Sequence, residues 1–439
     1  MNRFISPAKG LIAQFSPTTA FNIPGDKSLS HRAAMFSALA EGESRITNFL
    51  DSGVTSVMLT ALSALDIKWT LDENTLIVQG KGLNGFTTPT DPLDCGHSAT
   101  TIRLMAGALA ASGIGVTLDG SPGLRKRPMD RIVEPLQKLG VKISASNTGT
   151  APLVLIARDP KKGLLGGTIQ LSQASAQVKT CVLLAGLAAQ SELTIHEPGF
   201  SRDHSERMLK AMGVPLQING LTIRMPYFST PLKPLSMDLP GDISAAGFLI
   251  VAAIITQGSK LVLEEVGLNS TRTGLLDVLT SMGADLDVQI TAQTAGELTG
   301  RIIARSSKLQ GVTVSGDLVV RMIDEFPIFA VAAACAEGET VVKDATELRY
   351  KETDRIKALC QQLQNIGIMI KETRDGFIIQ GNQRIPGGTA QSCGDHRLAM
   401  SLAVAGLASQ QGVTIEDIEI INQSFPSFFD LLQYTGVSL

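Results

Sequence analysis

The chain has few aromatic residues, few cysteines and no long hydrophobic run. Aromatic residues make up 4% of the 439 residues, so its cores must be built from Ala, Leu, Ile and Val, a composition typical of α/β layering. The five cysteines are widely spaced without a CxxC pair, which argues against a disulfide framework or zinc site and favours reduced core thiols. The longest apolar run, Phe248–Ile255, is too short to cross a membrane.

Charge of one sign is not in excess either. The net charge is −3, so general affinity for nucleic acid is not expected, and any basic site must be local. Residues 1–24 show neither a secretory signal pattern nor an Arg/Ser-rich transit pattern, and we expect a cytoplasmic protein. A chain of 439 residues exceeds one ordinary core and predicts two or three domains.

A ten-residue segment occurs twice, with cations in only one copy. Residues 23–32 read I-P-G-D-K-S-L-S-H-R, and residues 239–248 read L-P-G-D-I-S-A-A-G-F. The shared Asp is a candidate N-cap of a following helix in each copy. Cations at a helix start oppose the helix dipole, at a cost of up to about 1 kcal/mol each. Lys27 and Arg32 therefore indicate an anionic ligand at the first copy.

The paired segment belongs to a repeat of six units. Each unit has a small-residue apolar run, a short β-like stretch, a second helical pattern that mostly closes near glycine, and a strand pair, so it predicts βαβαββ. The apolar runs are 32–40, 101–111, 181–189, 245–255, 327–336 and 398–408.

The last unit is incomplete, which predicts a discontinuous domain. Leu11–Phe15 matches the closing strands of other units, so we expect the N-terminal strand to complete the sixth unit. The chain would then cross between domains twice, the second time near Pro231–Pro240. The predicted domains are 21–239, with three units, and 1–20 plus 240–439, with the other three.

Charged and polar residues gather at the corresponding helix starts. These clusters are Asp94–Arg103, Arg125–Pro128, Ser175–Lys179, Ser201–His204, Asp324–Pro327, Lys351–Arg355 and Gly394–Arg397. If the helix starts of both domains face one cleft, these groups converge there. Helix N-termini and arginines suit phosphate and carboxylate, so such a cleft would bind polyanions. Asp324 and Glu352 could then exchange protons.

Each cluster also has an interpretation without a ligand. Arg125–Arg127 alone reads as a solvated loop, and Asp324–Glu325 as a helix cap with a first-turn charge. Lys351–Arg355 reads as surface salt bridging, and Asp395–Arg397 as a cap beside a buried histidine. The coincidence of these clusters at corresponding places in an Ala/Leu-rich repeat favours a binding site.

Together these motifs closely resemble the 5-enolpyruvylshikimate-3-phosphate (EPSP) synthase family of enolpyruvyl transferases, essentially end to end. The resemblance implies a two-domain inverse α/β barrel with three βαβαββ units in each domain. It also implies that the 5-hydroxyl of shikimate 3-phosphate adds to C2 of phosphoenolpyruvate, followed by loss of phosphate, without a metal or organic cofactor. The two small-molecule substrates would be bound in the cleft by a monomer, with neither nucleic acid nor membrane as a partner.

The resemblance also implies residue roles. Asp324 is the candidate base for the 5-hydroxyl, Glu352 serves proton transfer at the methylene carbon, and Lys27 contacts phosphoenolpyruvate and takes part in proton transfer. The residues expected to hold shikimate 3-phosphate are Lys27, Ser28, Arg32, Ser175, Ala176, Gln177, Arg202, Asp324 and Lys351. Those expected to bind phosphoenolpyruvate are Lys27, Ala99, Arg127, Gln177, Arg355, His396 and Arg397.

Four positions distinguish this chain within the resemblance. Gln423 stands where many members have lysine, Glu347 where some have asparagine, and His204 where some have tyrosine. These choices are more similar to the family's second class than to its first. Ala99 aligns with a glycine that borders the phosphoenolpyruvate and glyphosate site in sensitive members, so its methyl group predicts low glyphosate sensitivity.

Two alternatives stay open. UDP-N-acetylglucosamine enolpyruvyl transferase has the same fold and donor but usually presents a reactive cysteine on a flexible loop, whereas Cys95 precedes a helix start here. A six-unit chain could also be a non-catalytic ring scaffold around nucleic acid. The net charge of −3 and the carboxylate–arginine clusters argue against that scaffold.

Overall fold

The computed structural model describes residues 1–381 and 384–438 and divides into two compact units. The N-terminal unit comprises Gly25–Leu239 and Thr294–Glu297, and the C-terminal unit comprises Met1–Pro24, Pro240–Gln293 and Leu298–Leu439. Two short segments differ from the predicted domains. Residues 21–24 belong to the C-terminal unit, and residues 294–297 belong to the N-terminal unit.

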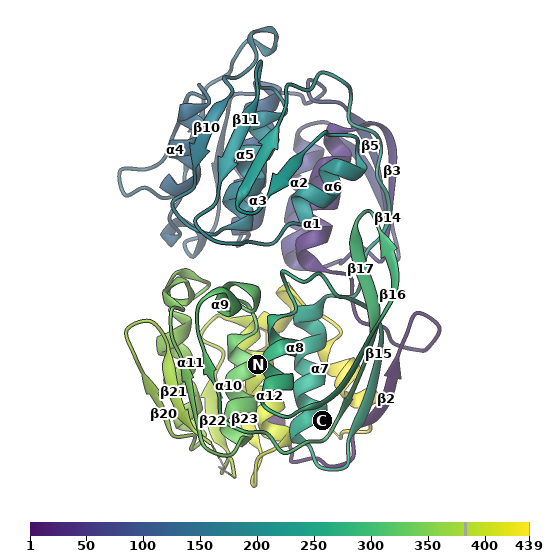
Figure 1. Ribbon diagram of the computed structural model, residues 1–439, viewed down its shortest axis with the longest axis vertical. Helices are drawn as coiled ribbons and strands as arrows, with labels where there is room; N and C mark the ends of the chain where they lie inside the picture. The colour runs from purple at the N-terminus through teal and green to yellow at the C-terminus, as the bar shows by residue number, and fades with distance from the viewer. Residues whose placement is uncertain (382–383, 439) are drawn as a thin grey trace. The chain divides into compact units, whose positions relative to one another are not determined.

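The strands of the N-terminal unit form three similar sheets, in the orders β14-β3-β5-β4, β6-β7-β9-β8 and β10-β11-β13-β12. Figure 1 labels β3, β5, β10, β11 and β14 among them. The strands are β3 (Glu41–Thr47), β4 (Lys68–Asp72), β5 (Thr75–Lys81), β6 (Leu93–Asp94), β7 (Val116–Asp119), β8 (Ile143–Ser144), β9 (Leu153–Leu155), β10 (Gly167–Gln170), β11 (Leu193–His196), β12 (Gln217–Asn219), β13 (Thr222–Met225) and β14 (Ser236–Asp238). The helices are α1 (Lys27–Leu39), α2 (Gly53–Ala64), α3 (Ala99–Ser112), α4 (Asp130–Lys138), α5 (Ala176–Gly186) and α6 (His204–Ala211), with 3₁₀ turns η1 (Leu124–Lys126) and η2 (Pro160–Lys162).

The C-terminal unit repeats the arrangement in the orders β16-β17-β15-β2, β18-β19-β21-β20 and β1-β23-β22. Its strands are β1 (Arg3–Ile5), β2 (Ile12–Phe15), β15 (Lys260–Gly267), β16 (Asp285–Thr294), β17 (Glu297–Arg305), β18 (Thr313–Val314), β19 (Glu339–Val342), β20 (Ile370–Glu372), β21 (Phe377–Gln380), β22 (Gly388–Gln391) and β23 (Val413–Glu416). Its helices are α7 (Ile243–Ile255), α8 (Gly274–Ser281), α9 (Asp317–Arg321), α10 (Phe326–Cys335), α11 (Arg355–Asn365), α12 (His396–Leu407) and α13 (Phe428–Tyr434), with η3 (Thr346–Tyr350) and η4 (Ile418–Gln423).

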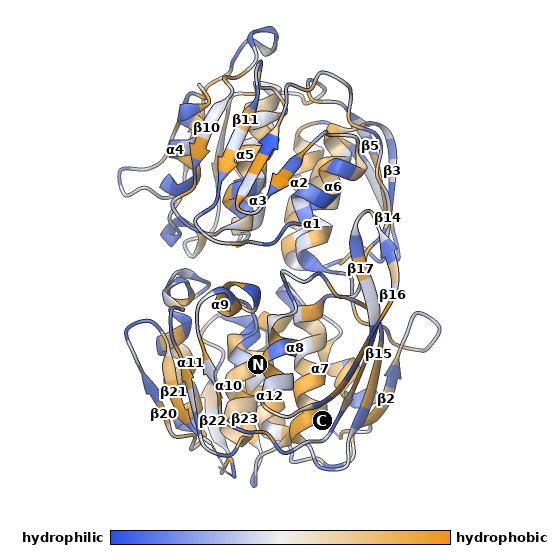
Figure 2. Cartoon of the chain, viewed as in Figure 1, coloured by the Kyte–Doolittle hydropathy of each residue, from blue (hydrophilic) through white to orange (hydrophobic). Residues whose placement is uncertain are grey.

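These sheets and helices confirm six mixed α/β repeats. In each sheet a leading strand runs parallel to the strand that follows the first helix, which in turn pairs antiparallel with another strand. The first helix of each repeat is buried along nearly its whole length because its small and aliphatic residues pack on all sides. In Figure 2, α7 is coloured mostly as hydrophobic residues, consistent with its sequence of Ala, Ile, Leu, Val and Phe with one Ser and one Gly.

The prediction that Leu11–Phe15 completes the sixth unit was wrong. Arg3–Ile5, which the sequence analysis did not single out, pairs with β23 and completes the sixth sheet. Leu11–Phe15, the segment chosen from the sequence, instead contains β2, which runs parallel to β15 in the fourth sheet. The fourth repeat accepts it because its leading-strand position is left open when β14 joins β3 in the first sheet.

Both Pro-Gly-Asp segments lie where the chain passes from one unit to the other, at residues 24–25 and 239–240. Backbone close approach explains each glycine. A Cβ on Gly25 would lie 1.7 Å from the carbonyl oxygen of Asn48, and one on Gly241 would lie 2.9 Å from Cβ of Ile23. The repeated motif therefore marks two of the places where the chain passes between the units, as well as two helix starts.

No helix among residues 1–381 and 384–438 is both long and apolar enough to span a bilayer.

Candidate functional site

The first Pro-Gly-Asp copy begins α1 as a capped helix. The side chain of Asp26 accepts a hydrogen bond from the backbone N–H of Leu29 at 2.9 Å, which confirms it as the N-cap. Lys27 and Ser28 follow in the first turn and are half-buried. The cap satisfies an N–H group of the helix start, and both residues lie in the turn that the sequence analysis assigned to a ligand.

Arg32 is more deeply buried than we expect of a residue that binds a ligand at the surface. Its side chain is 2% exposed, and its guanidinium donates to Ser205 Oγ at 2.8 Å, Thr180 Oγ1 at 3.1 Å and the carbonyl oxygen of Ser28 at 2.9 Å. Arg32 thus joins α1 to α5 and α6. This arrangement fixes the backbone of Ser28, which the sequence also assigned to shikimate 3-phosphate.

The start of α3 is tied to α1 through a buried histidine. Ser98 caps α3 by accepting from the N–H of Thr101 at 3.1 Å, and His31 Nε2 lies 3.2 Å from Ser98 Oγ. Burial lowers the pKa of His31 to about 4, so the ring is neutral near pH 7. Ala99 is the first residue of α3 and is 3% exposed, so its methyl group has a fixed place.

Gln177 is held by a residue that the site prediction did not include. Arg103, 7% exposed, donates to Gln177 Oε1 and, at 3.2 Å, to the carbonyl oxygen of Pro128. The amide of Gln177 donates to Thr100 Oγ1 at 2.9 Å. Arg103 therefore connects Gln177 with the backbone beside Arg127. The sequence did contain a signal, because Arg103 lies in the polar cluster that begins α3.

Ser175, Ala176 and Arg202 lie at two helix starts of the third repeat. Ser175 caps α5 and Ala176 is its first residue, whereas Arg202 is half-buried just before α6. Beneath them, Lys179 is 1% exposed and forms ion pairs with Glu197 at 2.9 Å and Glu206 at 2.7 Å. Burial alone would lower the pKa of Lys179, but these two carboxylates raise it.

The Lys179 triad reaches the segment that carries Arg202. Ser201 donates to the Glu197 carboxylate, and the ammonium of Lys179 lies 3.5 Å from the carbonyl oxygen of Ser201. Because Lys179 is held among buried acceptors, its role is to fix this segment, although the sequence placed it among the polyanion-binding groups.

A second cluster, the carboxylate–arginine cluster, lies in the C-terminal unit. Asp324 is its centre, with Lys351 Nζ at 3.3 Å, Arg355 Nη1 at 3.5 Å and Arg397 Nη2 at 4.0 Å from its carboxylate oxygens. Glu352 accepts from Arg355 Nη2 at 2.6 Å. The sequence predicted all five of these residues, and the structure brings them together.

Buried partners orient the arginines of this cluster. Asp395 is completely buried, caps α12, and accepts from Arg355 Nε at 2.6 Å. Burial alone would lower the pKa of Arg355, but Asp395, Glu352 and Asp324 raise it, so its charge is permanent. Burial likewise would raise the pKa of Asp395, whereas Arg355 lowers it. His396 and Arg397, each 5% exposed, follow the capped start of α12.

The second Pro-Gly-Asp copy is connected to this cluster by buried hydrogen bonds. Asp242 caps α7 by accepting from Ser244 N–H at 2.8 Å. Buried Arg272 donates to Asp242 at 3.0 Å and to Ser244 Oγ at 2.7 Å, and Ser244 in turn donates to Glu325. Glu325 precedes α10 and adjoins Asp324. The sequence suggested a copy without most of the ligand chemistry, and gave no sign of this network.

Three further predictions concern side chains beside the clusters. His204 is 2% exposed, with Nδ1 2.8 Å from the Glu297 carboxylate. Gln423 ends η4, and Glu347 lies within η3. The prediction of core thiols fails for Cys393, which is exposed, and holds for Cys95, Cys181 and Cys360, which are buried. Cys393 has a positive φ of 52° in the turn before Asp395.

Comparison with known proteins identifies the family. The profile described as EPSP synthase (3-phosphoshikimate 1-carboxyvinyltransferase) matches residues 18–432. The chain belongs to the EPSP synthase family. It is 44% identical to the 3-phosphoshikimate 1-carboxyvinyltransferase of Geobacter metallireducens and 45% identical to that of Syntrophomonas wolfei. Each alignment covers 98% of this chain and 98% of the relative.

Solved structures agree with the family assignment. The EPSP synthase of Acinetobacter baumannii superimposes with a TM-score of 0.87 at 38% identity, covering 100% of this chain and 98% of that chain. The mixed α/β repeats are therefore those of EPSP synthase structures.

Proposed function

We propose that this protein is a 3-phosphoshikimate 1-carboxyvinyltransferase, which transfers the enolpyruvyl group of phosphoenolpyruvate to the 5-hydroxyl of shikimate 3-phosphate. The observation that carries the proposal is the cluster of Asp324, Lys351, Glu352, Arg355 and Arg397. It combines two carboxylates for proton transfer with cations for an anionic substrate. Membership of the EPSP synthase family supports the same reaction.

The addition step assigns a base and an acid. Asp324 accepts the proton of the 5-hydroxyl while the hydroxyl oxygen forms a bond to C2 of phosphoenolpyruvate. Glu352, entering the step in its protonated form, gives its proton to C3 as the C2–C3 double bond becomes a single bond. Lys351, 3.3 Å from Asp324, holds the shikimate ring near this carboxylate. Arg355 and Arg397 bind the anionic groups of phosphoenolpyruvate and stabilise charge as it shifts toward the phosphate.

In the elimination step, C3 loses a proton again. The C2–O bond to phosphate breaks, inorganic phosphate leaves with the bonding electrons, and Glu352 removes a proton from C3 to form the enolpyruvyl ether. Glu352 is oriented for this role by its hydrogen bond from Arg355 at 2.6 Å. The two carboxylates thus act at different atoms of the same adduct.

The cluster of the N-terminal unit contributes binding to this reaction. Lys27, Ser28, Ser175, Ala176 and Arg202 stand at capped or polar helix starts, which suit the phosphate of shikimate 3-phosphate. Arg32 acts by fixing Ser28 through its backbone carbonyl.

Phosphoenolpyruvate draws on a second group of residues. Lys27, Ala99, Arg127 and Gln177 serve it from the N-terminal unit. Arg355, His396 and Arg397 serve it from the C-terminal unit. We assign Lys27 to both substrates because it begins α1, beside the cap.

A phosphate-release assay tests the proposal. The wild-type protein should release phosphate with phosphoenolpyruvate and shikimate 3-phosphate together. Asp324→Asn should lower kcat by about 10²–10⁴-fold, the range for loss of a general base. Asp317→Asn, at an exposed position in α9, is the matched control and should retain activity. Phosphate release with UDP-N-acetylglucosamine as the acceptor, and none with shikimate 3-phosphate, would overturn the assignment.

Three finer features complete the proposal. The methyl group of Ala99 restricts glyphosate more than phosphoenolpyruvate, so the enzyme is glyphosate-insensitive. The enzyme works as a cytoplasmic monomer and needs no metal or organic cofactor. Sedimentation should give one chain per particle, and activity should survive dialysis against a chelator.

A further inference from the structure

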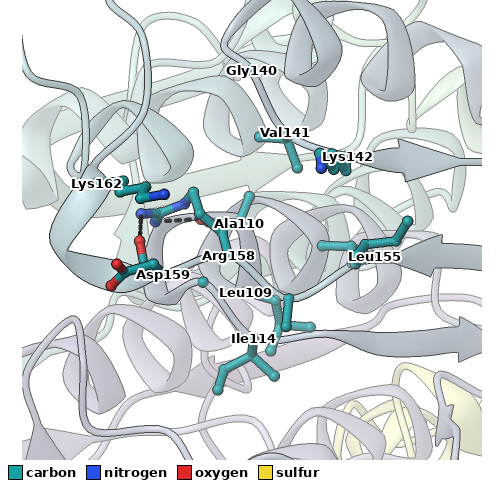
Figure 3. A pocket seen from close by; sticks show the side chains of 13 residues that line it. Leu109, Ala110, Ile114, Gly140, Val141, Lys142, Leu155, Arg158, Asp159 and Lys162 are labelled. Carbon is teal, nitrogen blue, oxygen red and sulfur yellow. Dashed lines mark hydrogen bonds between the residues drawn. The ribbon is translucent and has the colours of Figure 1, made fainter.

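A cavity of about 250 Å³ opens in the N-terminal unit at the C-terminal end of α3 (Figure 3). Its apolar walls are Leu109 from α3, Ile114 from the following loop, Val141 from the loop after α4, and Leu155 from β9. Leu109, Val141 and Leu155 are buried, whereas Ile114 is half-buried. These walls form a preformed surface for an apolar group.

Cations outnumber carboxylates around this cavity. Arg158, Lys142 and Lys162 line it together with a single carboxylate, Asp159. Lys142 and Lys162 are exposed and Arg158 is half-buried. The local charge therefore favours an anion, although the protein as a whole carries a net charge of −3.

Arg158 is held in place by the end of α3. Its Nη2 donates to the carbonyl oxygen of Ala110 at 3.1 Å, and its Nη1 donates to that of Asp159 at 3.0 Å (Figure 3). Nη2 also donates to the carbonyl oxygen of Ala111 at 2.8 Å. Burial lowers the pKa of Arg158. A guanidinium fixed in this way is preorganised, so little side-chain entropy is lost when a ligand binds.

We propose that this cavity binds a small carboxylate with an apolar body. The carboxylate lies against the three cations, and the body packs on the apolar walls. Ligand pockets for drug-sized molecules have about 300–1,000 Å³, so this smaller cavity suits a metabolite. The site is separate from the candidate phosphoenolpyruvate residues, because Ala99 lies at the other end of α3, a helix about 20 Å long.

Two matched probes test the chemistry of the ligand. 3-Phenylpropionate and the neutral 3-phenyl-1-propanol have nearly the same body but differ in charge. Calorimetric titration of the full chain should detect binding of 3-phenylpropionate at millimolar concentration. The affinity for 3-phenyl-1-propanol should be at least about fivefold lower. Equal binding of both probes, or no binding of 3-phenylpropionate up to about 10 mM, would overturn the proposal.

Two neighbouring lysines supply matched variants. Lys161 and Lys162 are both exposed in η2, but only Lys162 is among the lining residues. Lys162→Glu should weaken 3-phenylpropionate binding about fivefold, and Lys161→Glu by less than about twofold, since an exposed charge acts mainly at short range. Ala157→Phe, at an exposed lining position, should block the cavity without disturbing the core. Equal effects of the two lysine variants would contradict the assigned position.

Competition separates this site from the proposed active site. 3-Phenylpropionate should bind with unchanged affinity when phosphoenolpyruvate alone, or shikimate 3-phosphate alone, is saturating. Displacement by either substrate would place the probe in the active site and refute a separate cavity site. This result does not depend on catalysis, so failure of the cavity proposal can be distinguished from failure of the proposed function.

Discussion

Ser244 of the second Pro-Gly-Asp segment donates a hydrogen bond to Glu325, the residue that follows Asp324. Both side chains are nearly completely buried, and Arg272 donates to Ser244 Oγ at 2.7 Å. Arg397 Nη1 lies 3.9 Å from the same carboxylate. Ser244 therefore connects a helix start to the backbone and cation that flank the candidate base.

Ser244→Ala should destabilise the protein, whereas the equivalent Ser28→Ala should affect substrate binding. The first change leaves a buried carboxylate short of a hydrogen bond, so the free energy of unfolding should fall by about 1.5–3 kcal/mol. Ser28 is half-buried in the turn assigned to shikimate 3-phosphate, so its change should raise KM with less than about 1 kcal/mol of destabilisation. Denaturant unfolding and steady-state kinetics measure both.

The paired serines make this prediction specific. If Ser28→Ala were the more destabilising variant, or Ser244→Ala raised KM for shikimate 3-phosphate while leaving stability intact, the assigned roles would have to be exchanged.

His31 should make the stability of the N-terminal unit depend on pH. The unfolded chain binds a proton at this histidine near pH 6.5, but the folded chain does so only near pH 4. As pH falls through this window, the unfolded state gains protons that the folded state does not, so stability is lost. The total loss from this group is about 3 kcal/mol, and it is complete below pH 4.

A single tryptophan provides the measurement. Trp69 is the only tryptophan of the chain and lies in β4 of the same unit, so its fluorescence reports unfolding there. His31→Gln should remove most of the difference in unfolding free energy between pH 6.5 and pH 4. A variant with the same pH dependence as the wild type would show that other groups cause it.

Local patterns predicted the repeats well, because cap residues and apolar runs act over a few neighbouring positions. Asp26, Asp242 and Asp395 are caps in the structure, and Asp324 and Arg355 do lie together. Strand partners were harder to predict, since the sequence near Leu11–Phe15 fits more than one sheet edge.

Buried pairs between distant residues could not be predicted either, because local sequence patterns do not show which distant residues come into contact. The partners Ser244 and Glu325 are 81 residues apart, and Arg32 and Ser205 are 173 apart. A cation in a polar motif looks the same in sequence whether it meets a ligand or a buried acceptor. Arg32 and Lys179 both meet buried acceptors, and only the packing of α1, α5 and α6 could reveal this.

Arg103 should act on catalysis through Gln177. Its guanidinium donates to Gln177 and to the carbonyl oxygen of Pro128, so Arg103→Met should lower kcat/KM for phosphoenolpyruvate by about 10–100-fold. In a double-mutant cycle with Gln177→Ala, the two effects should be non-additive by about 0.5–3 kcal/mol. Additive losses would mean that Arg103 contributes independently of Gln177.

Ala99→Gly should make the enzyme sensitive to glyphosate, to which we expect the wild type to be insensitive. The methyl group is fixed at the first position of α3, and relief of overpacking is typically worth about 1–3 kcal/mol, so the inhibition constant should fall at least about fivefold. KM for the shorter phosphoenolpyruvate should change less, because we expect the methyl group to crowd the longer inhibitor more than the substrate. Ala99→Ser keeps a side chain at this position and should stay insensitive, which controls for general effects of substitution at the helix start. Equal, tight inhibition of the wild type and Ala99→Gly would show that the methyl group does not determine the response.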